Sequence, residues 1–411
     1  MAIITHNPID TRRSRIPLHG FRRSFHGLAM RVPKKDIGQT QKTFNVLPGE
    51  SIQKAIEAAK LVGGGIVFIK NGTHTPKATI TTYSNITILG ENLGSAIIDF
   101  EGGSYQIQAV GSSAYSTGTV SVTKGSTAVT GSSTLWSANV SAGQQILLQG
   151  IWYTIAAVGS DTGITLAIPY AGSTLSGATY VAATTVKDTV VEKLYLTNSA
   201  TDAVKARYAN NFRIDNCQFV ANAGGLDADD CSQLAMEEGD FVANNTGLTL
   251  TNVHFSDFNY IGIIDALASH GYTLDTVTNC SFFANFILNA AGDGMNITSS
   301  SNIGIDTCSI RGNGGQGIEF VSGNSDIFVS GSAVQSNASD GIKVTATSDH
   351  IIITGGCSIK SNGGYGLNIA ASTCDENLVV GNVFSSNTTA AYTNSGTGTL
   401  IRSNIGAADS P

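Results

Sequence analysis

A short motif recurs four times in the C-terminal part of the chain, at a nearly constant spacing of roughly 25 residues. Its copies occupy residues 308–313, 332–337, 357–362 and 382–387. Each copy begins with Cys, Ser or Asn, places an apolar residue two positions later and ends on Asn. A unit this short buries its apolar side chains only by stacking on its neighbours. The repeat therefore predicts a solenoid of β-coils in which the asparagines stack as a hydrogen-bonded ladder.

The first residues of the motif also occur upstream, beginning at Cys217, Val253 and Cys280. These starting positions are called headings below. The steps between these positions, and the step from Cys280 to Cys308, are all longer than the steps between the C-terminal copies. They predict extra loop length within residues 222–300, and insertions on one face of a solenoid mark its binding site.

The composition fits many short strands joined by tight turns, because the chain has 47 Gly, 7 Pro and only 13% charged residues. No apolar run is long enough to cross a membrane, so no membrane insertion is expected. Neither a CxxC pair nor zinc-ligand spacing is present. Four of the six cysteines take the first position of the motif, which predicts stacked core thiols rather than disulfides; they are Cys217, Cys280, Cys308 and Cys357.

The N-terminal part of the body predicts one amphipathic helix followed by a strand. Apolar residues recur at helical spacing from Ile52 to Ala59, three glycines at 63–65 end the helix, and residues 66–69 form a β run. The phrase ESIQKAIEAA…GGGIVFIKNGTHTP resembles the start of the pectate-lyase-like β-helix superfamily, which includes many phage tailspikes. The resemblance implies an all-β, single-stranded right-handed parallel β-helix whose N-terminal helix covers the open end of the coil stack.

Residues 112–184 interrupt this pattern with short alternating strands joined by Gly, Ser and Asp-Thr-Gly turns, as in a hairpin meander. The stretch 120–158 resembles a small β module of phage tail and fibre proteins. Coil-like strands resume at 190–196, so we expect an inserted domain. The predicted organisation is then a basic arm (1–43), a capping helix with first coils (44–111), the inserted domain (112–184) and the main β-helix with its tail (185–411).

Charge is divided unevenly between the arm and the body. Residues 1–43 carry nine Lys or Arg against two Asp, a balance of +7, which leaves −14 on the remainder of a chain whose net charge is −7. A basic arm on an acidic body indicates docking to a negatively charged partner, and a merely solvated leader is the alternative. The tailspike resemblance implies that this arm attaches the chain to other virion proteins.

Acidic residues and histidines are densest within residues 222–300. Two carboxylates across a groove are the minimum apparatus for glycoside hydrolysis, and the candidates are Asp229, Glu237, Asp257 and Asp265. As in pectate lyases, clustered aspartates could instead bind Ca²⁺ and neutralise a uronate; no other cofactor is expected. Asx turns and solvated loops are the structural alternative for these aspartates.

Side chains for carbohydrate binding are expected in the same stretch. The candidates are Tyr260 and Tyr272, which would stack on sugar rings, together with His254, His270 and Arg207. His254 stands between Val253 and Phe255, so strand alternation predicts an exposed imidazole if its neighbours belong to the core.

Three functions are compatible with these features. The first is a phage tailspike-like or fibre-like virion protein, made in the host cytoplasm, that binds and could degrade host surface polysaccharide. The resemblance implies a homotrimer, although no C-terminal trimerisation domain is evident. The second is a free polysaccharide lyase, hydrolase or epimerase, which the absence of an apolar leader disfavours. The third is a structural or decoration protein of the virion.

Overall fold

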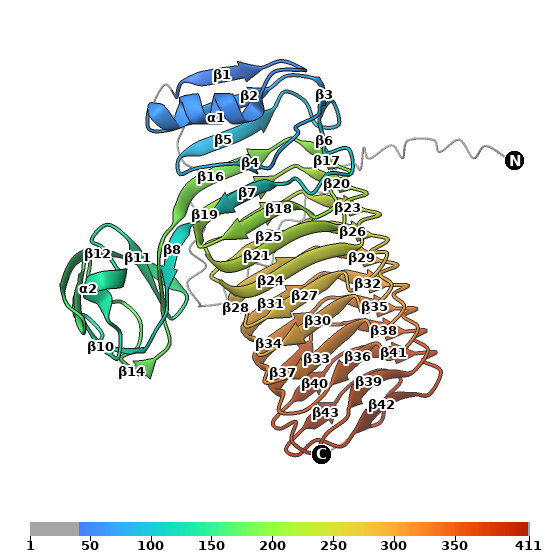
Figure 1. Cartoon of the computed structure of the whole chain (residues 1–411). Coiled ribbons are helices and arrows are strands. Elements are labelled where there is room, and N and C mark those ends of the chain that lie inside the picture. The colour runs from blue at the N-terminus through green and yellow to red at the C-terminus, as the bar shows by residue number, and fades with distance from the viewer. Residues whose placement is uncertain (1–40, 410–411) are drawn as a thin grey trace, which may run out of the picture. The chain divides into compact units, whose positions relative to one another are not determined.

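The computed structural model describes residues 41–409, so nearly all of the predicted basic arm, residues 1–43, lies outside the described residues. The chain forms a 24-stranded sheet, an 11-stranded sheet and a separate eight-stranded sheet. Strands of the two larger sheets pair in parallel with strands one coil away, and Figure 1 shows these coils following one another toward the C-terminus. This is an all-β parallel β-helix.

The 24-stranded sheet consists of two series of stacked strands. The first series contains β1 (Thr43–Val46), β2 (Gly65–Ile69), β5 (Ile86–Gly90), β16 (Val186–Glu192), β19 (Ala209–Asp215), β22 (Ala235–Glu237), β25 (Asp257–Asn259), β28 (Thr278–Phe283), β31 (Ser301–Asp306), β34 (Ser325–Ser330), β37 (Asp349–Thr354), β40 (Leu378–Val380) and β43 (Leu400–Arg402). The second series contains β4 (Ile80–Thr81), β7 (Ile107–Val110), β18 (Asp202–Arg207), β21 (Gly224–Ser232), β24 (Thr246–His254), β27 (Tyr272–Asp275), β30 (Met295–Thr298), β33 (Ile318–Ser322), β36 (Ile342–Val344), β39 (Tyr365–Ile369) and β42 (Ala390–Asn394).

The 11-stranded sheet is the third series. It contains β3 (Gly72–His74), β6 (Ala96–Asp99), β17 (Tyr195–Thr197), β20 (Gln218–Val220), β23 (Asp240–Val242), β26 (Gly262–Ile264), β29 (Phe286–Leu288), β32 (Ser309–Arg311), β35 (Ala333–Gln335), β38 (Ser358–Lys360) and β41 (Val383–Ser385).

A bend joins the second series to the first. Strand β24 pairs with β27 at Leu248 and with β28 at His254, so one strand passes from one series into the next. Left-handed residues mark this bend in successive coils, among them Asp230 and Asn252, whose φ angles are 50° and 52°. Asp and Asn adopt this conformation more readily than most residues, which explains their abundance at the bend.

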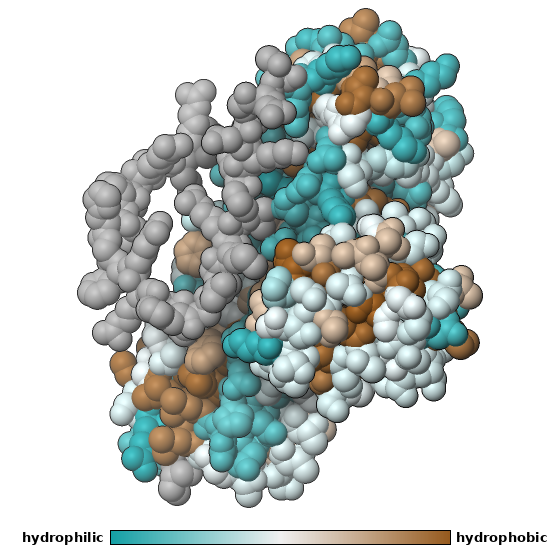
Figure 2. All heavy atoms as spheres, turned by 90° about the vertical axis from the view of Figure 1, so that its left-hand side faces the viewer, coloured by the Kyte–Doolittle hydropathy of each residue, from teal (hydrophilic) through white to brown (hydrophobic). Residues whose placement is uncertain are grey.

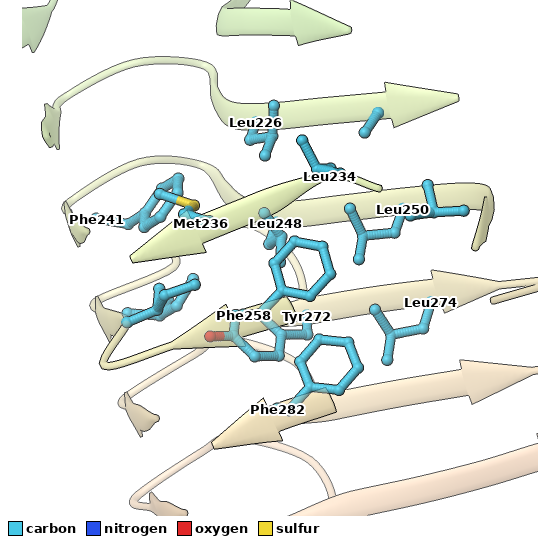
Figure 3. Packing of buried hydrophobic residues seen from close by; sticks show 14 of the residues in the cluster. Leu226, Leu234, Met236, Phe241, Leu248, Leu250, Phe258, Tyr272, Leu274 and Phe282 are labelled. Atoms are coloured by element: carbon cyan, nitrogen blue, oxygen red, sulfur yellow. The ribbon is translucent and has the colours of Figure 1, made fainter. Parts of the chain in front are cut away.

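Inward side chains of the three series form one continuous core. Aromatic residues stack on their counterparts in the next coil: the rings of Phe219 and Phe241 lie 4.3 Å apart and those of Phe258 and Phe282 lie 5.0 Å apart. Figure 3 shows Phe258 and Phe282 one above the other, with Leu248 and other aliphatic side chains filling the interior beside them.

The coil length corrects one expectation. One register position of the third series is occupied in successive coils by Phe219, Phe241, Ile263, Ile287 and Ile310. No step between these residues exceeds the step from Ile310 to Val334 in the next coil. The coils within residues 222–300 are therefore no longer than the later ones, and the predicted extra loop length is wrong. The headings at Cys217 and Cys280 gave a wrong coil length because they are not equivalent positions. Cys217 precedes third-series strand β20, whereas Cys280 lies within first-series strand β28 and pairs with Ile303.

All six cysteines are buried and free, as expected for core thiols. Because Cys280 belongs to a different series, however, it does not share the column of Cys217, Cys308 and Cys357. Neither helix within residues 41–409 has the length and apolar character of a membrane span.

Buried asparagines follow the third-series strands as a ladder. Asn244 Oδ1 accepts hydrogen bonds from the backbone N–H and the side-chain amide of Asn222, at 2.9 and 3.0 Å. Asn244 Nδ2 donates to the Phe219 carbonyl at 2.8 Å. The same bonds recur from Asn313 through Asn337 and onward to Asn362 and Asn387. Each amide thus satisfies polar groups of the coil before it.

One helix lies at the N-terminal end of the coils. Helix α1 (Ile52–Leu61) begins at Ser51, whose hydroxyl accepts a hydrogen bond from the Lys54 backbone N–H. Its buried side chains Ile52, Ile56 and Ala59 join the solenoid core.

The eight-stranded sheet lies between β7 and β16 in the sequence and has its own core around Trp136. It is antiparallel wherever its strands pair. Its elements are β8 (Ser112–Tyr115), β9 (Thr119–Val122), β10 (Ala128–Ser132), α2 (Trp136–Asn139), β11 (Gln145–Leu148), β12 (Ile151–Ser160), β13 (Gly163–Leu166), β14 (Leu175–Ala178) and β15 (Val181–Thr184). The coil stack continues directly across it, because β16 pairs with β5. Figure 2 shows the side of the molecule that carries this sheet, and much of the visible surface is of intermediate hydropathy.

The ladder predicts that Asn244 contributes much more to stability than its neighbour Asn245. Replacing Asn244 by Ala removes the acceptor of the buried Asn222 backbone N–H and the amide that donates to the Phe219 carbonyl, while the Asn222 side chain keeps its bond to the Leu196 carbonyl. We therefore expect a loss of about 1–3 kcal/mol. Replacing the exposed Asn245 by Ala is expected to change stability by less than about 0.5 kcal/mol. Guanidinium unfolding followed by circular dichroism measures both. Equal unfolding curves for the two variants would contradict the ladder's role.

Candidate functional site

Charged side chains gather on the outer surface of the first series, on strands β19, β22 and β25. Ile214, Met236 and Phe258 point into the core at equivalent positions, so the residues on either side of them point outward. This alternation brings Arg213, Asp215, Glu237 and Asp257 to one surface, hereafter the carboxylate cluster.

Arg213 connects two of these carboxylates. Its Nη2 lies 2.8 Å from Asp215 Oδ2 and 2.9 Å from Glu237 Oε2. Burial lowers the pKa of the guanidinium, but the two carboxylates outweigh that effect and raise it. Arg213 therefore stays charged and holds Glu237 in place from the preceding coil.

Asp257 lies one coil beyond Glu237 and has no cation beside it among the described ion pairs. Burial raises the pKa of Asp257, and the negative charge of Glu237 raises it further. The folded chain therefore holds the Asp257 proton more tightly than the unfolded chain does. This difference reduces stability as the pH rises from the unfolded-state pKa of Asp257 to its higher folded-state pKa. A surface that retains such a carboxyl group is a candidate for acid–base chemistry.

Aromatic rings flank the carboxylate cluster. Tyr260 directly follows β25 and is 58% exposed. Its ring meets that of Phe283 edge to face, with 5.7 Å between the centroids. Phe283 pairs with Asn259 at an outward position, next to the buried Phe282. Tyr260 is among the predicted residues, whereas Phe283 is not, although alternation from the buried Phe282 indicates that it points outward.

The second series carries a separate group of ion pairs. Lys205 Nζ lies 2.5 Å from Asp227 Oδ2, and Arg207 Nε lies 2.9 Å from Asp229 Oδ2. Burial, followed by the charge of Asp230, raises the pKa of Asp229, while Arg207 opposes this rise. Each of these aspartates thus faces a cation of the preceding coil. Within residues 41–409, no three His, Cys, Asp or Glu side chains are placed to hold a metal ion.

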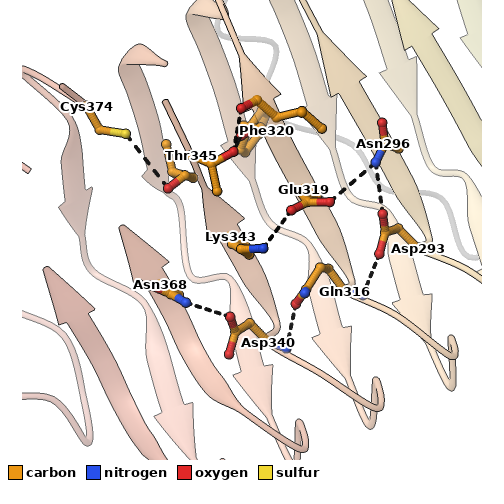
Figure 4. A network of polar contacts seen from close by, with 12 residues as sticks. Asp293, Asn296, Gln316, Glu319, Phe320, Asp340, Lys343, Thr345, Asn368 and Cys374 are labelled. Carbon is orange, nitrogen blue, oxygen red and sulfur yellow. Dashed lines mark hydrogen bonds and ion pairs between the residues drawn. The ribbon is translucent and has the colours of Figure 1, made fainter. Parts of the chain in front are cut away.

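His270 and Asp293 begin a further polar strip on the second series. His270 Nδ1 accepts the Asp293 backbone N–H at 2.9 Å, and Asp293 Oδ1 accepts that of Gln316 at 2.7 Å. Gln316 and Asp340 continue the pattern in the following coils, as Figure 4 shows in part. Because Nδ1 is an acceptor here, neutral His270 carries its proton on Nε2. His270 Nδ1 also lies 3.2 Å from Asp293 Oδ2.

Two of the predicted carbohydrate contacts have buried side chains: Tyr272, for which stacking on a sugar ring is wrong, and His254, for which the expected exposure is wrong. Tyr272 is completely buried and lies among core side chains near Phe258 and Phe282 (Figure 3), and burial raises the pKa of its hydroxyl well above the ordinary value. His254 is only 7% exposed, because Gly150 of the eight-stranded sheet covers it. Burial lowers the pKa of His254 to about 4.

The remaining candidates lie apart from the carboxylate cluster. Asp265 follows third-series strand β26, has a φ of 58° and accepts a hydrogen bond from Asn289 Nδ2 at 3.1 Å. Asp229, Arg207 and His270 belong to the second series. The structure therefore brings together Glu237, Asp257 and Tyr260 from the candidates, and separates the others.

Comparison with known proteins agrees with this architecture. Residues 238–405 match the family model described as "Right handed beta helix region". The chain is a right-handed parallel β-helix. The β-helix that the N-terminal phrase predicts is thus confirmed.

Several solved structures are similar to this chain at low sequence identity. The A-module of mannuronan C-5 epimerase AlgE4 from Azotobacter vinelandii is 13% identical, with a TM-score of 0.56, over 88% of this chain and 100% of that one. The AlgE6 A-module from the same organism is 14% identical, with a TM-score of 0.55, over 87% and 95%. The tailspike protein gp49 of Pseudomonas phage LKA1 is 14% identical, with a TM-score of 0.45, over 83% and 64%. A comparison with curated protein sequences found no match.

The coupling between Glu237 and Asp257 leads to a prediction about their titration. Replacing Glu237 by Gln removes the negative charge next to Asp257, so the pKa of Asp257 is expected to fall while staying above its ordinary value because of burial. Carboxyl ¹³C NMR titration measures this change. Glu238→Gln is the matched control, because Glu238 is exposed and follows β22 at a left-handed position. An unchanged Asp257 titration in Glu237→Gln would show that the two groups do not interact.

Proposed function

We propose that this β-helix binds a polysaccharide along the outer surface of β19, β22, β25 and β28. The observation that carries the proposal is the position of the exposed Tyr260 and of Phe283 beside the carboxylate cluster. Aromatic rings pack against the apolar faces of sugars, while carboxylates and Arg213 bind hydroxyl groups. Equivalent residues of successive strands lie about 4.8 Å apart. A linear polymer lying along the stack would therefore meet a series of such groups.

Asp257 and Glu237 support cleavage of the bound polymer as a second candidate activity. The protonated carboxyl of Asp257 would donate its proton to the glycosidic oxygen as the bond to the anomeric carbon breaks. The Glu237 carboxylate would either attack that carbon or take a proton from the water that attacks it. Groups whose environments differ in this way are suited to opposite roles.

A virion is the setting that we propose for this activity. The support comes from the +7 balance of residues 1–43 and from the resemblance of residues 120–158 to modules of phage tail and fibre proteins. In this setting the arm attaches the chain to other virion proteins and the β-helix meets the host surface polysaccharide. A free polysaccharide-modifying enzyme would use the same carboxylate cluster without the arm.

Variants of the carboxylate cluster separate binding from cleavage. Tyr260→Ala is expected to weaken polysaccharide binding about tenfold, because one stacking contact is worth about 1–2 kcal/mol. Asp257→Asn is expected to retain binding and lose at least about a hundredfold in cleavage rate. Binding is measured on a panel of bacterial capsular polysaccharides and alginate, and cleavage by the release of reducing ends. Tyr365→Ala, on the second series, is the control. The absence of binding to every polymer of the panel would overturn the proposal.

The virion setting is tested by deletion of residues 2–40, which leaves strand β1 intact. The shortened chain is expected to fold and to bind polysaccharide as the full chain does, but to be absent from purified particles. Co-sedimentation of each form with particles is the measurement. Particle association that survives the deletion would rule out the arm as the attachment segment.

A further inference from the structure

A cavity of about 820 Å³ lies where the eight-stranded sheet meets the solenoid. On one side it is lined by the β11–β12 turn and by strand β15, and on the other by the starts of β28 and β31 and the end of β24. We propose that this cavity binds an uncharged sugar unit. Its size falls within the range of about 300–1,000 Å³ that is typical of small-ligand sites.

The cavity is bounded by a close contact between the two parts. Gly150 lies directly against His254, and a Cβ atom at Gly150 would come within 2.5 Å of the imidazole. Gly150 also has a φ of +79°, so only glycine fits this position easily. Leu147 and Trp152 pack with Tyr208 of the solenoid in a small apolar cluster. The wall is therefore held in place by packing on both sides of the turn.

The lining contains no Asp, Glu, Lys or Arg. Its single titratable imidazole, His254, is held between Thr278 Oγ1 at 2.5 Å and Asn252 Oδ1 at 2.7 Å. Because Asn252 donates its own amide to Asp230, its oxygen receives the His254 Nε2–H, and Nδ1 accepts from Thr278. The ring is thus neutral. A charged ligand would lose its hydration here without meeting an opposite charge, whereas an uncharged one would not.

The polar groups that line the cavity suit sugar hydroxyls. Ser301 offers a hydroxyl, and Asn279 and Gln149 offer amide N–H groups from opposite walls. The oxygen of Asn279 accepts from Asn302 and that of Gln149 accepts from Tyr170 and Ser173. The Thr278 hydroxyl, which donates to His254, is left as an acceptor. Leu147, Tyr153 and Val181 supply apolar surface. A sugar ring has the same combination, with polar edges and apolar C–H faces, so both kinds of lining would be used by one ligand.

Strand β28 lines the cavity and also pairs with β25 of the carboxylate cluster. Thr278 lines the cavity, whereas Ser281, three residues later, pairs with Asp257. Three residues of strand span about 10 Å. If the proposed polysaccharide binding is right, the cavity holds an uncharged sugar a short distance from the cleavage point, and so selects polymers with a neutral residue there. Saccharide binding in the cavity does not itself depend on cleavage.

Filling the cavity tests the inference. The probes are neutral trisaccharides built from glucose, galactose, mannose and N-acetylglucosamine, with trigalacturonate as the charged comparison, and binding to the full chain is followed by saturation-transfer NMR and calorimetry. Ser301→Trp projects a large side chain into the cavity and is expected to weaken binding of the neutral trisaccharides at least about tenfold. Ser325→Trp, at the same column position one coil further on, lies outside the lining and is expected to have no effect.

Two further variants keep the outcomes distinct. Asn279→Ala removes a polar contact without filling space and is expected to weaken neutral trisaccharide binding. Asp257→Asn is expected to leave that binding unchanged, so loss of cleavage and loss of cavity binding can be told apart. The inference is overturned if no neutral trisaccharide binds, if trigalacturonate binds equally well, or if Ser301→Trp binds as tightly as the unaltered chain.

Discussion

Parallel pairing between successive coils is the constraint on which the rest of this structure depends. Each residue of a coil lies about 4.8 Å from a counterpart in the next coil. Every side chain must therefore be compatible with the side chains stacked above and below it. Asn244 is buried without penalty only because Asn222 and Phe219 offer partners in the coil before it. The same rule stacks Phe258 on Phe282 in the core. Stability is therefore shared between neighbouring coils rather than located in any one of them.

Parallel pairing places like charges of one column close together, which is unfavourable. The acidic residues of the carboxylate cluster therefore need a reason beyond the fold. Glu192, Asp215 and Glu237 occupy one outward column in three successive coils. Like charges at strand spacing destabilise a sheet, and Arg213 compensates by pairing with two of them. Asp257, in the neighbouring column, has no such compensation, and its pKa rises. A column serving only the fold would more simply hold Ser or Thr, so the retained repulsion supports a chemical role for this surface.

The sequence revealed the fold because a motif of fixed spacing implies stacking, and the coils at 308–387 repeat closely. It wrongly predicted extra loop length within residues 222–300, because the start of the motif looks alike in first-series and third-series strands and alternation alone does not tell them apart. Alternation placed His254 outside the coil, opposite the core residue Val253, but did not reveal that Gly150 of the eight-stranded sheet covers the imidazole. The sequence indicated Glu237, Asp257 and Tyr260 as candidate site residues from their side-chain chemistry. Their adjacency depends on the short coil that pairs strand β22 with β25, which the headings did not reveal.

The cavity was beyond sequence reasoning for a different reason. Its walls come from residues far apart in the sequence, because the eight-stranded sheet leaves the coil stack after β7 and contacts β24 and β28 several coils later. The outer surface of a repeating coil has no deep recess of its own. The eight-stranded sheet, packed against that surface, forms one. The two parts also differ in chemistry: the coils present charged columns, and the turn around Gly150 buries a neutral imidazole. An uncharged, open recess next to charged columns gives one binding surface two means of discriminating between sugars.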